Sequence, residues 1–339
     1  MSATIKDIAQ LAGVSHTTVS RALNGSPLIH PATRERIVQI AEQLHYTPNR
    51  SARSLVHGRS NSIGIFFSTL GEGTSSSFFH ASVRGVSRVL QDRYNLVVRG
   101  IDDYADYREV GPKRFEGALV MSQQDRDDAF LRHLQEQQIP HVVLNRRAGG
   151  EEMASIVAGD REGAFALTKH LIGLGHRRIA VLEGVSGFRA TRERMSGYED
   201  ALRAAGLGRR RDYTAAGRYD LASGYEGMLR LLALPERPTA VFCMNDEMAV
   251  GALKAAREAG ISVPDDLSLA GFDDNGFSAY VTPPLTTVRR PIEEMSREGA
   301  RVLLAMLEGR PAPAGTTCLP AELVVRGSTG PCGCRSSAG

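Results

Sequence analysis

Pairs of polar residues follow five of the apolar runs in this sequence, and their chemistry suits a site for a small molecule. The pairs are Ser68-Thr69, Ser122-Gln123, Asn145-Arg146, Asn245-Asp246 and Asp273-Asp274. Their hydroxyl, amide, carboxylate and guanidinium groups all bind polar ligands through hydrogen bonds. Taken singly, each pair is typical of a loop or a helix cap. Their repeated placement indicates a ligand cleft beyond the carboxyl ends of parallel strands.

The sequence carries no comparable signal for catalysis. It lacks a G-x-x-x-x-G-K-[ST] phosphate loop, and residues 173–178 begin like G-x-G-x-x-G but end without the third glycine. Residues 184–188 fail as a nucleophile elbow because Phe188 replaces the second glycine. The nine histidines form no H-E-x-x-H motif. We therefore expect a protein that is not an enzyme and that holds no cofactor and no metal.

The apolar runs alternate with helical stretches, which predicts an α/β body with doubly wound parallel sheets. The predicted strands are 63–68, 96–101, 117–122, 139–144, 179–183, 240–244 and 267–272. The predicted helices include 78–91, 127–137, 162–172, 192–205, 247–259 and 292–307. This arrangement places each polar pair at the carboxyl edge of its sheet.

Length and composition fit a globular protein of two or three domains. The chain has 339 residues, of which 42% are hydrophobic and 23% charged. No apolar run reaches the ~20 residues of a membrane helix, and the N-terminus lacks the layout of a signal peptide. We expect a cytoplasmic protein whose four cysteines are reduced. Cys332 and Cys334 form a close pair that we expect to lie in a loose tail, although such a pair can also oxidise or bind metal.

Positive charge gathers in the first 60 residues. They hold seven Lys and Arg against three Asp and Glu, a net charge of +4, whereas the remaining residues carry −1. A basic head on a nearly neutral body suggests that the head contacts a polyanion. The charge alone does not distinguish a polyanion contact from a chance distribution. The helical pattern of the head is the further evidence that distinguishes them.

The pattern of the head predicts two helices joined by a tight turn. Thr4 and Asp7 suit a helix start, Gly13 suits a turn with positive φ, and Ser15 suits the cap of a second helix that ends near Leu23. The residues expected to face the core are Ile5, Ile8, Ala9, Ala12, Val19 and Leu23, with Ile37, Ile40, Ala41 and Leu44 from a third helix. This pattern is typical of a helix-turn-helix, whose second helix enters the major groove of DNA.

Polar side chains cover the outward face of the second predicted helix. They are His16, Thr17, Thr18, Ser20 and Arg21, all able to bond base edges or phosphates. The alternative is an ordinary helical hairpin, but the local charge and the N-terminal position favour DNA binding. The following basic segment, 47–60, either folds on DNA with Leu55 wedged into the minor groove or is a basic linker.

Short motifs spread over the chain, up to about residue 328, point to one known family. They include TIKDIA at 4–9, AGVS at 12–15, TVSR at 18–21, YTPN at 46–49, ARSL at 52–55, ND at 245–246 and LTTV at 285–288, with further matches at 63–64, 171–179, 238–241 and 269–274. In combination they resemble the lac repressor/galactose repressor family of transcription factors, with the later segments most like the galactose and purine repressor branch.

The resemblance implies a domain organisation. It comprises a helix-turn-helix domain at 1–46, a hinge helix or linker at 47–60, a two-lobed effector-binding and dimerisation domain at 61–328 and a flexible tail at 329–339. The body would resemble periplasmic sugar-binding proteins, with an N-lobe of about 61–158 and 291–319 and a C-lobe of about 160–288 and 320–328. The chain would cross between the lobes near 157–160, 288–291 and 320.

The same resemblance implies the functional residues. For DNA binding they are Ser15, His16, Thr17, Thr18, Arg21, Asn24 and Leu55. For the effector they are Phe79, Asn145, Asp160, Arg194, Tyr219, Asn245 and Asp273. Carboxylates and the Arg194 guanidinium would bracket sugar hydroxyl groups, while the Tyr219 ring would cover an apolar C–H face.

Two segments depart from the family pattern. The family carries a longer helix between 95 and 117, whereas here the stretch 103–110 is cut short by Gly111-Pro112. The loop 71–77 is longer and more polar than usual. No leucine heptad follows Ser328, so we expect dimers and not tetramers.

These observations predict a homodimeric repressor of a carbohydrate-utilisation operon, which a galactose-like sugar releases from a palindromic operator. Within the family, a ligand that acts as co-repressor is the alternative. Outside it, the alternatives are a sugar-binding transport protein and an enzyme of sugar metabolism. The basic head and the missing signal peptide argue against transport, and the missing catalytic motifs argue against an enzyme.

Overall fold

The computed structural model describes residues 3–23, 26–46, 60–71, 73–147, 153–311 and 313–333. The chain forms two compact units, a head of residues 1–60 and a body of residues 61–339. Each unit is described by itself.

The head consists of three helices, α1 (Ile5–Ala12), α2 (His16–Leu23) and α3 (Pro31–Gln43). The Asp7 carboxylate accepts hydrogen bonds from the N–H (2.7 Å) and the hydroxyl (2.8 Å) of Thr4, which fixes the start of α1. Gly13 ends α1 with a φ of 61°, a conformation that favours glycine. The Ser15 hydroxyl then accepts from the Thr18 N–H at 3.1 Å and caps α2. The predicted helix–turn–helix is therefore present.

A small apolar core holds the three helices together. Ile8, Val19 and Ile37 are fully buried, one from each helix, and Ala12 is nearly so. Leu23, Ile40 and Leu44 of the predicted stripe are only partly buried around them. The buried face of α2 thus fixes which of its side chains point outward.

The body contains two parallel sheets. The N-lobe sheet has the order β11-β5-β4-β3-β1-β2, and the C-lobe sheet has the order β7-β6-β8-β9. Their strands are β1 (Ser62–Phe67), β2 (Asn95–Gly100), β3 (Gly117–Met121), β4 (His141–Leu144), β5 (Ser155–Ala158), β6 (Ile179–Glu183), β7 (Thr214–Ala216), β8 (Ala240–Cys243), β9 (Ser268–Ala270) and β11 (Thr316–Leu319). A separate antiparallel pair joins β10 (Thr287–Arg289) to β12 (Glu322–Val324).

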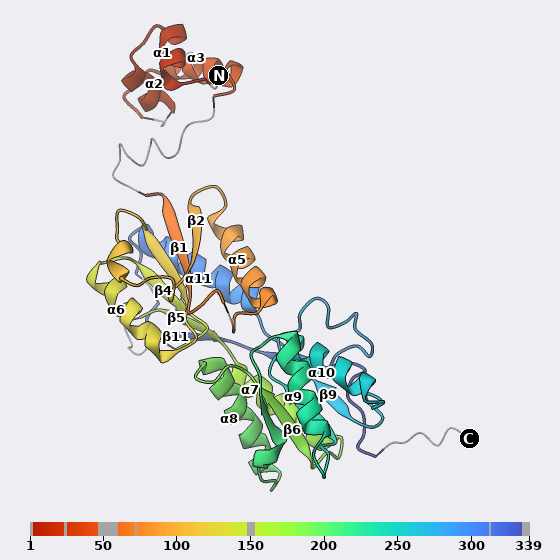
Figure 1. Ribbon diagram of the computed structural model, residues 1–339. Coiled ribbons are helices and arrows are strands. Elements are labelled where there is room, and N and C mark those ends of the chain that lie inside the picture. The colour runs from red at the N-terminus through yellow and green to blue at the C-terminus, as the bar shows by residue number, and fades with distance from the viewer. Residues whose placement is uncertain are drawn as a thin grey trace. The chain divides into compact units, whose positions relative to one another are not determined.

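Helices cover both faces of the two sheets, as Figure 1 shows. In the N-lobe, α5 (Ser76–Leu90) and α11 (Ile292–Leu307) pack together on one face, and α6 (Asp128–Glu136) covers the other. In the C-lobe, α7 (Asp160–Gly173) pairs with α8 (Arg189–Ala204), and α9 (Leu221–Leu232) pairs with α10 (Asp246–Glu258). This is the doubly wound arrangement that the alternation of strands and helices predicts.

Neighbouring residues of the N-lobe strands feed two separate cores. Ile65 and Phe67 of β1 pack with α5 and α11, whereas Phe66 between them packs with Phe130 of α6. Side chains alternate between the faces of a strand, so a sheet that is covered on both faces needs a continuous apolar run. The run at 63–67 meets that need because all five of its residues are buried.

The chain passes between the two lobes three times. The passages lie between β5 and α7, between β10 and α11, and between β11 and β12. The first and third passages adjoin, since the Gly159 N–H donates to the Leu319 carbonyl at 2.9 Å, and β10 before the second passage pairs with β12 after the third. The passages therefore form one hinge, and residues at the strand ends of both sheets line one cavity. The polar strand ends therefore meet in the space between the lobes.

Several elements of the body differ from the sequence-based expectations. The short strands β5, β7, β10, β11 and β12 and the helix α9 were not predicted. In α9, Gly224 and Gly227 lower the helix propensity, but a Cβ at Gly224 would lie 2.1 Å from the carbonyl oxygen of Met248 on α10. Close packing of α9 on α10 thus requires Gly224, the same residue that lowers the helix propensity and prevented the prediction of α9.

The segment 103–110 forms only a single 3-10 turn, Tyr107–Glu109. Asp103 and Asp106 instead accept hydrogen bonds from nearby backbone N–H groups, those of Gly100 and Arg108, each at 2.9 Å. Such side-chain bonds compete with a helix, so the shortening is greater than Gly111-Pro112 alone implies.

The chain beyond residue 328 was expected to be a loose tail, but its first residues pack on the C-lobe. The Gly330 N–H donates to the Ser268 hydroxyl at 3.0 Å, and the Cys332 N–H donates to the Leu174 carbonyl at 2.8 Å. The buried His176 ring also contacts the Gly330 carbonyl at 3.0 Å. Cys334 lies outside the described residues.

Close packing of α7 on α8 gives a first prediction. A Cβ at Gly197 would lie 2.1 Å from the carbonyl oxygen of Arg161, so Gly197→Ala must separate the two helices. We expect the free energy of unfolding to fall by about 1–3 kcal/mol, measured by urea denaturation with circular dichroism. Gly173→Ala on α7, where no atom lies within 4 Å, is the matched control and should keep the midpoint or raise it slightly, because alanine favours a helix over glycine. Equal midpoints for the two variants would contradict the packing.

Candidate nucleic-acid interface and ligand cleft

The head presents one polar helix face to its surroundings. His16, Thr17 and Arg21 are exposed on α2, on the side opposite the buried Val19 and Ala22. Ser15 and Thr18 lie at the start of the helix, and their hydroxyls contact each other at 2.9 Å. Asn24 and Leu55, also predicted to contact DNA, lie outside the described residues. The exposed groups match those that bind base edges and phosphates.

A narrow cavity of 30 Å³ lies between the lobes of the body. It is lined by Gly73, Ser75, Phe78, Gln123, Asn145, Ala190, Arg194, Tyr219, Asn245, Asp273 and Arg290. Four of the five predicted polar pairs contribute to this lining, so the expected convergence of strand ends occurs. The fifth pair supports it indirectly, since the Ser68 hydroxyl accepts from the Gln123 N–H at 2.7 Å.

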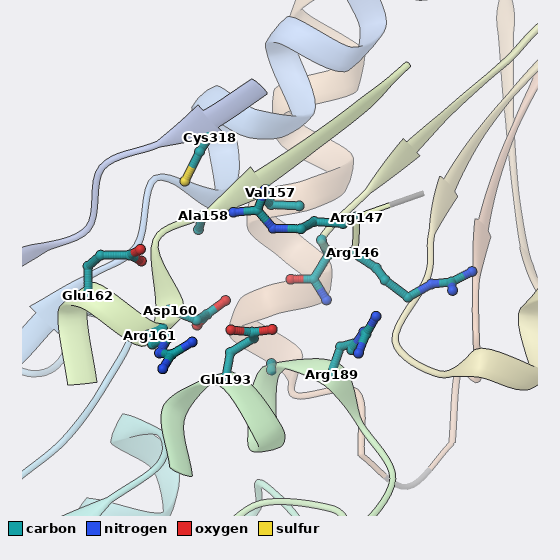
Figure 2. Close-up of a pocket in the computed structure, with 12 residues that line it drawn as sticks. Arg146, Arg147, Val157, Ala158, Asp160, Arg161, Glu162, Arg189, Glu193 and Cys318 are labelled. Atoms are coloured by element: carbon teal, nitrogen blue, oxygen red, sulfur yellow. The ribbon is translucent and has the colours of Figure 1, made fainter. Parts of the chain in front are cut away.

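Larger cavities open on two sides of this centre. A cavity of 330 Å³ shares Asn145 and Ala190 with it, and a cavity of 270 Å³ shares Phe78, Asp273 and Arg290. Figure 2 shows the larger one, with Val157 and Ala158 of β5 on one side and Arg189 and Glu193 of α8 on the other. The three cavities together form the cleft.

Two guanidinium groups and two carboxylates form an ion cluster at the centre of the cleft. Arg194 Nε lies 2.8 Å and Arg290 Nε 2.9 Å from the same oxygen, Oδ1 of Asp160. Asp273 Oδ1 is farther away, at 3.4 Å from Arg194 and 3.5 Å from Arg290. The arginine side chains are only 2% and 3% exposed, so these pairs are screened little by water.

Burial and charge oppose each other within the ion cluster. Burial raises the pKa of Asp273 above its ordinary value, although Arg194 and Arg290 act against this. Burial lowers the pKa of Arg194, but the Asp160 and Asp273 carboxylates outweigh it and raise that pKa overall. Arg194 therefore stays charged, and it also donates to the Met244 carbonyl.

Aromatic rings border the ion cluster. The Arg194 guanidinium lies 4.1 Å from the centre of the Phe272 ring and 5.8 Å from that of Tyr219. The Tyr219 hydroxyl contacts the Thr191 hydroxyl at 2.7 Å. These contacts fix the Tyr219 ring as a flat apolar wall of the cleft.

The predicted aromatic residue of the N-lobe is displaced by one position. Phe79 is absent from the lining of the three cavities, and its ring packs on Phe67 with 5.4 Å between ring centres. Phe78, next to it on α5, lines the cleft instead. Neighbouring residues of a helix point about 100° apart, so an error of one residue turns the side chain away.

Asn245 and Asp246 hold the C-lobe side of the cleft in place. Asn245 accepts from the Met248 N–H and donates to the Tyr219 carbonyl, both at 2.9 Å. Asp246, fully buried, accepts from Ser278 at 2.7 Å and from Thr287 at 2.6 Å. Both residues thus cap α10 or tie loops together, and only Asn245 lines the cavity.

Strained backbone conformations gather at the cleft. Asn145, Tyr219, Asp273 and Asp274 have φ values of 69°, 65°, 114° and 55°. Non-glycine residues rarely adopt such values, and each costs of order 1–3 kcal/mol. Three of them are residues that were assigned to the effector from the sequence. Such strain is typical of positions that are held for a function.

Six residues that line the 30 Å³ cavity were not assigned to the effector from the sequence: Gly73, Ser75, Phe78, Gln123, Ala190 and Arg290. Gln123 belongs to one of the polar pairs, and that pattern is its signal. Arg290 follows a short strand and precedes Pro291 at a lobe crossing, so its signal is a charged residue at a predicted hinge. The six other assigned effector residues lie in or beside the cleft, with Asp160 beneath the two arginines.

The cleft offers donors and acceptors on all sides and one aromatic wall, which suits a polar ring with hydroxyl groups. Across the described ranges, no group of three or more His, Cys, Asp or Glu is placed to hold a metal ion. In the same part of the chain, no helix combines the length and apolar character needed to cross a membrane.

Helix-turn-helix head and two-lobed cleft together define a class of protein, the ligand-binding transcriptional regulators. Two family models match, bacterial regulatory proteins of the lacI family over residues 4–49 and a periplasmic binding protein-like domain over residues 168–329. The chain is 47% identical to the probable HTH-type transcriptional repressor ExuR of Bacillus subtilis, covering 96% of this chain and 98% of that protein. It is 37% identical to the HTH-type transcriptional regulator GalR of Escherichia coli K12, covering 96% and 95%.

Solved structures agree with these relatives. The lac repressor dimer bound to operator and the anti-inducer ONPF superposes with a TM-score of 0.84, at 28% identity, over 97% of this chain and 100% of that one. A complex of the transcriptional regulator CelR with cellobiose gives a TM-score of 0.72, at 32% identity, over 96% and 99%. The chain belongs to the lacI family of bacterial regulatory proteins, which confirms the resemblance and the predicted fold class.

Buried Asp246 gives a prediction about pH. Burial, with the nearby Asp273, raises the pKa of Asp246 from 3.8 to about 7. Between these pH values the folded chain keeps a proton that the unfolded chain releases, so native stability falls as pH rises, by about 1.4 kcal/mol per unit. The amide of Asp246→Asn escapes this loss. Its stability relative to the native protein should rise by about 2 kcal/mol from pH 5 to pH 6.5.

Urea unfolding at the two pH values measures that difference directly. Titrating groups that do not interact with Asp246 are common to both proteins and cancel in the comparison. A difference that stays constant with pH would show that Asp246 is ionised throughout this range.

Proposed function

We propose that this protein is a homodimeric repressor that binds a palindromic operator and is released from it by a sugar. The observation that carries the proposal is the union, in one chain, of an exposed polar recognition helix and a closed polar cleft between two lobes. The repressors and regulators to which it is similar, ExuR and GalR among them, support this function. We propose that it acts by binding alone and catalyses no reaction.

The proposed DNA contacts are His16, Thr17 and Arg21 at base edges, with Ser15 and Thr18 near phosphates. Their support is the exposure of the first three side chains on one face of α2. From the sequence we add Asn24 near a phosphate and Leu55 as a minor-groove wedge. Two such heads would read two half-sites, because a two-fold dimer matches a two-fold operator.

The proposed ligand is a sugar, with a galactose-like ring as the first candidate. Its hydroxyl groups would bond Asn145, Arg194, Asn245 and Asp273, and its apolar face would lie on Tyr219, with Phe78 in the place first given to Phe79. Asp160 would act through the two arginines that it pairs. The similar transcriptional regulator CelR was solved as a complex with cellobiose, which supports a carbohydrate as the class of ligand.

Arg21→Ala tests the reading of bases. Loss of a bidentate arginine contact should weaken operator binding by about 1–3 kcal/mol and binding to random DNA much less. Lys6→Ala is the matched control, since it removes the same charge from the exposed surface of α1. That variant should weaken both DNAs alike. Fluorescence anisotropy at fixed salt gives the affinities, and equal losses for Arg21→Ala on both DNAs would refute a base-reading role.

A screen of sugars by thermal unfolding tests the ligand. A sugar that fills the cleft should raise the unfolding temperature of the native protein, because it binds the folded state alone. The same sugar should weaken operator binding about 5- to 150-fold, the usual range of coupling between two sites. A sugar that raises the unfolding temperature but strengthens operator binding would be a co-repressor, and this result would overturn the proposed release.

A further inference from the structure

Arg290 is a buried guanidinium at the centre of the cleft. Its side chain is 3% exposed, and it lies between the end of β10 and the start of α11. It lines both the 30 Å³ cavity and the 270 Å³ cavity, so it forms part of the wall between them. A ligand that extends from one cavity into the other must contact this side chain.

The contacts of Arg290 join the two lobes. Its Nη2 donates to Asn145 Oδ1 at 2.7 Å and to Asp160 Oδ2 at 3.0 Å. Asn145 follows the N-lobe strand β4, and Asp160 begins the C-lobe helix α7. One guanidinium therefore bridges the lobes through the position where a ligand would sit.

The central 30 Å³ cavity leaves too little space for a sugar without movement of a side chain. A cavity of 30 Å³ holds about two water molecules, whereas pockets for small ligands measure roughly 300–1,000 Å³. Opening the wall between the 30 Å³ and 270 Å³ cavities would give a space of that size. Of the two central arginines, Arg194 is fixed by its stacking on Phe272 and its bonds to Asp160 and the Met244 carbonyl.

Arg290 is held by fewer hydrogen bonds than Arg194, and two of its nitrogens, Nε and Nη1, make no well-aligned hydrogen bond. Its Nε–H makes no aligned hydrogen bond, although Asp160 lies close to it. Its Nη1 is 3.5 Å from Asp273, beyond the usual hydrogen-bond length. A guanidinium has five N–H donors in a fixed fork, which suits adjacent hydroxyl groups of a sugar ring.

We infer that Arg290 recognises ligand hydroxyl groups directly, exchanging its bond to Asn145 for bonds to the ligand. The inference rests on the proposed sugar site and adds a residue that sets its specificity. The exchange also reaches the N-lobe, because α11 begins two residues later and its Glu293 pairs with Arg84 and Arg88 of α5. Ligand binding at Arg290 is thus connected to the helices of the N-lobe.

The test compares Arg290→Gln with Arg289→Gln. Arg289→Gln is the matched control because it removes the same charge one residue away, yet the Arg289 side chain is 54% exposed and lines none of the three cavities. Isothermal titration uses galactose, cellobiose and ribose, followed by the monodeoxy analogues of the sugar that binds. Circular dichroism and thermal unfolding establish that each variant is folded.

We expect Arg290→Gln to weaken binding of that sugar tenfold or more, and Arg289→Gln to stay within twofold of native. One deoxy analogue should bind the native protein at least tenfold more weakly than the parent sugar. Arg290→Gln should not distinguish that analogue from the parent, because the lost hydroxyl is the partner of the lost guanidinium. A purely structural role for Arg290 would not produce this selective loss.

The inference is overturned if Arg290→Gln binds the sugar with an affinity within twofold of native. It is also overturned if removing each hydroxyl group from the sugar weakens binding to Arg290→Gln by the same factor as binding to the native protein. Should Arg290→Gln fail to fold, Arg290→Lys replaces it, since lysine keeps the charge without the fork, and the same selective loss is expected. If the native protein binds none of the three sugars, the proposed function fails together with this inference. Native binding with an unchanged variant removes this inference alone.

Discussion

The ion cluster of Arg194, Arg290, Asp160 and Asp273 is the interaction on which the closed body depends. Its members come from α7, α8, the loop after β9 and the crossing segment before α11, and Arg290 extends the cluster to Asn145 of the N-lobe. Buried guanidinium groups are costly unless carboxylates and hydrogen bonds compensate them, so each member needs the others in place. The lobes are therefore held together by charges that a polar ligand can also satisfy.

This balance explains how a small molecule can act on a large body. In a buried ion cluster, the cost of desolvation and the attraction between the charges nearly cancel. Exchanging one partner for a ligand hydroxyl therefore changes the free energy of the closed state by only about a few kcal/mol. A ligand that is bound differently in two arrangements shifts the population between them. The Ser77 hydroxyl on α5, which contacts Glu247 of α10 at 3.2 Å, and Arg192, which pairs with Asp125 at 2.8 Å, add contacts between the lobes outside the cleft. A rearrangement of the ion cluster would therefore also change these contacts.

The sequence predicted the parts of this architecture that rest on local patterns. The helix-turn-helix followed from Gly13 and its flanking stripes, and the cleft followed from polar pairs at strand ends. Features fixed by tertiary packing were missed. The helix α9 was missed because Gly224, which lowers its helix propensity, is needed for its contact with α10. Arg290 was missed because only the fold brings a hinge residue to the centre of the cleft. Phe79 was assigned where Phe78 lies, since a resemblance aligned to within one residue cannot fix the face of a helix. The contacts of residues 329–332 were missed because the bonds of Gly330 and Cys332 are made by backbone groups, which leave no mark on composition.

The central claim is that the cleft and the DNA-binding head share one free-energy linkage. Linkage is reciprocal, so the operator must change the affinity for the sugar by the same factor by which the sugar changes the affinity for the operator. The direct measurement is isothermal titration of the sugar into the native protein, once alone and once saturated with operator DNA. We expect the operator-bound protein to bind the sugar more weakly, by the same factor by which the sugar weakens operator binding. Equal sugar affinities with and without operator would contradict it.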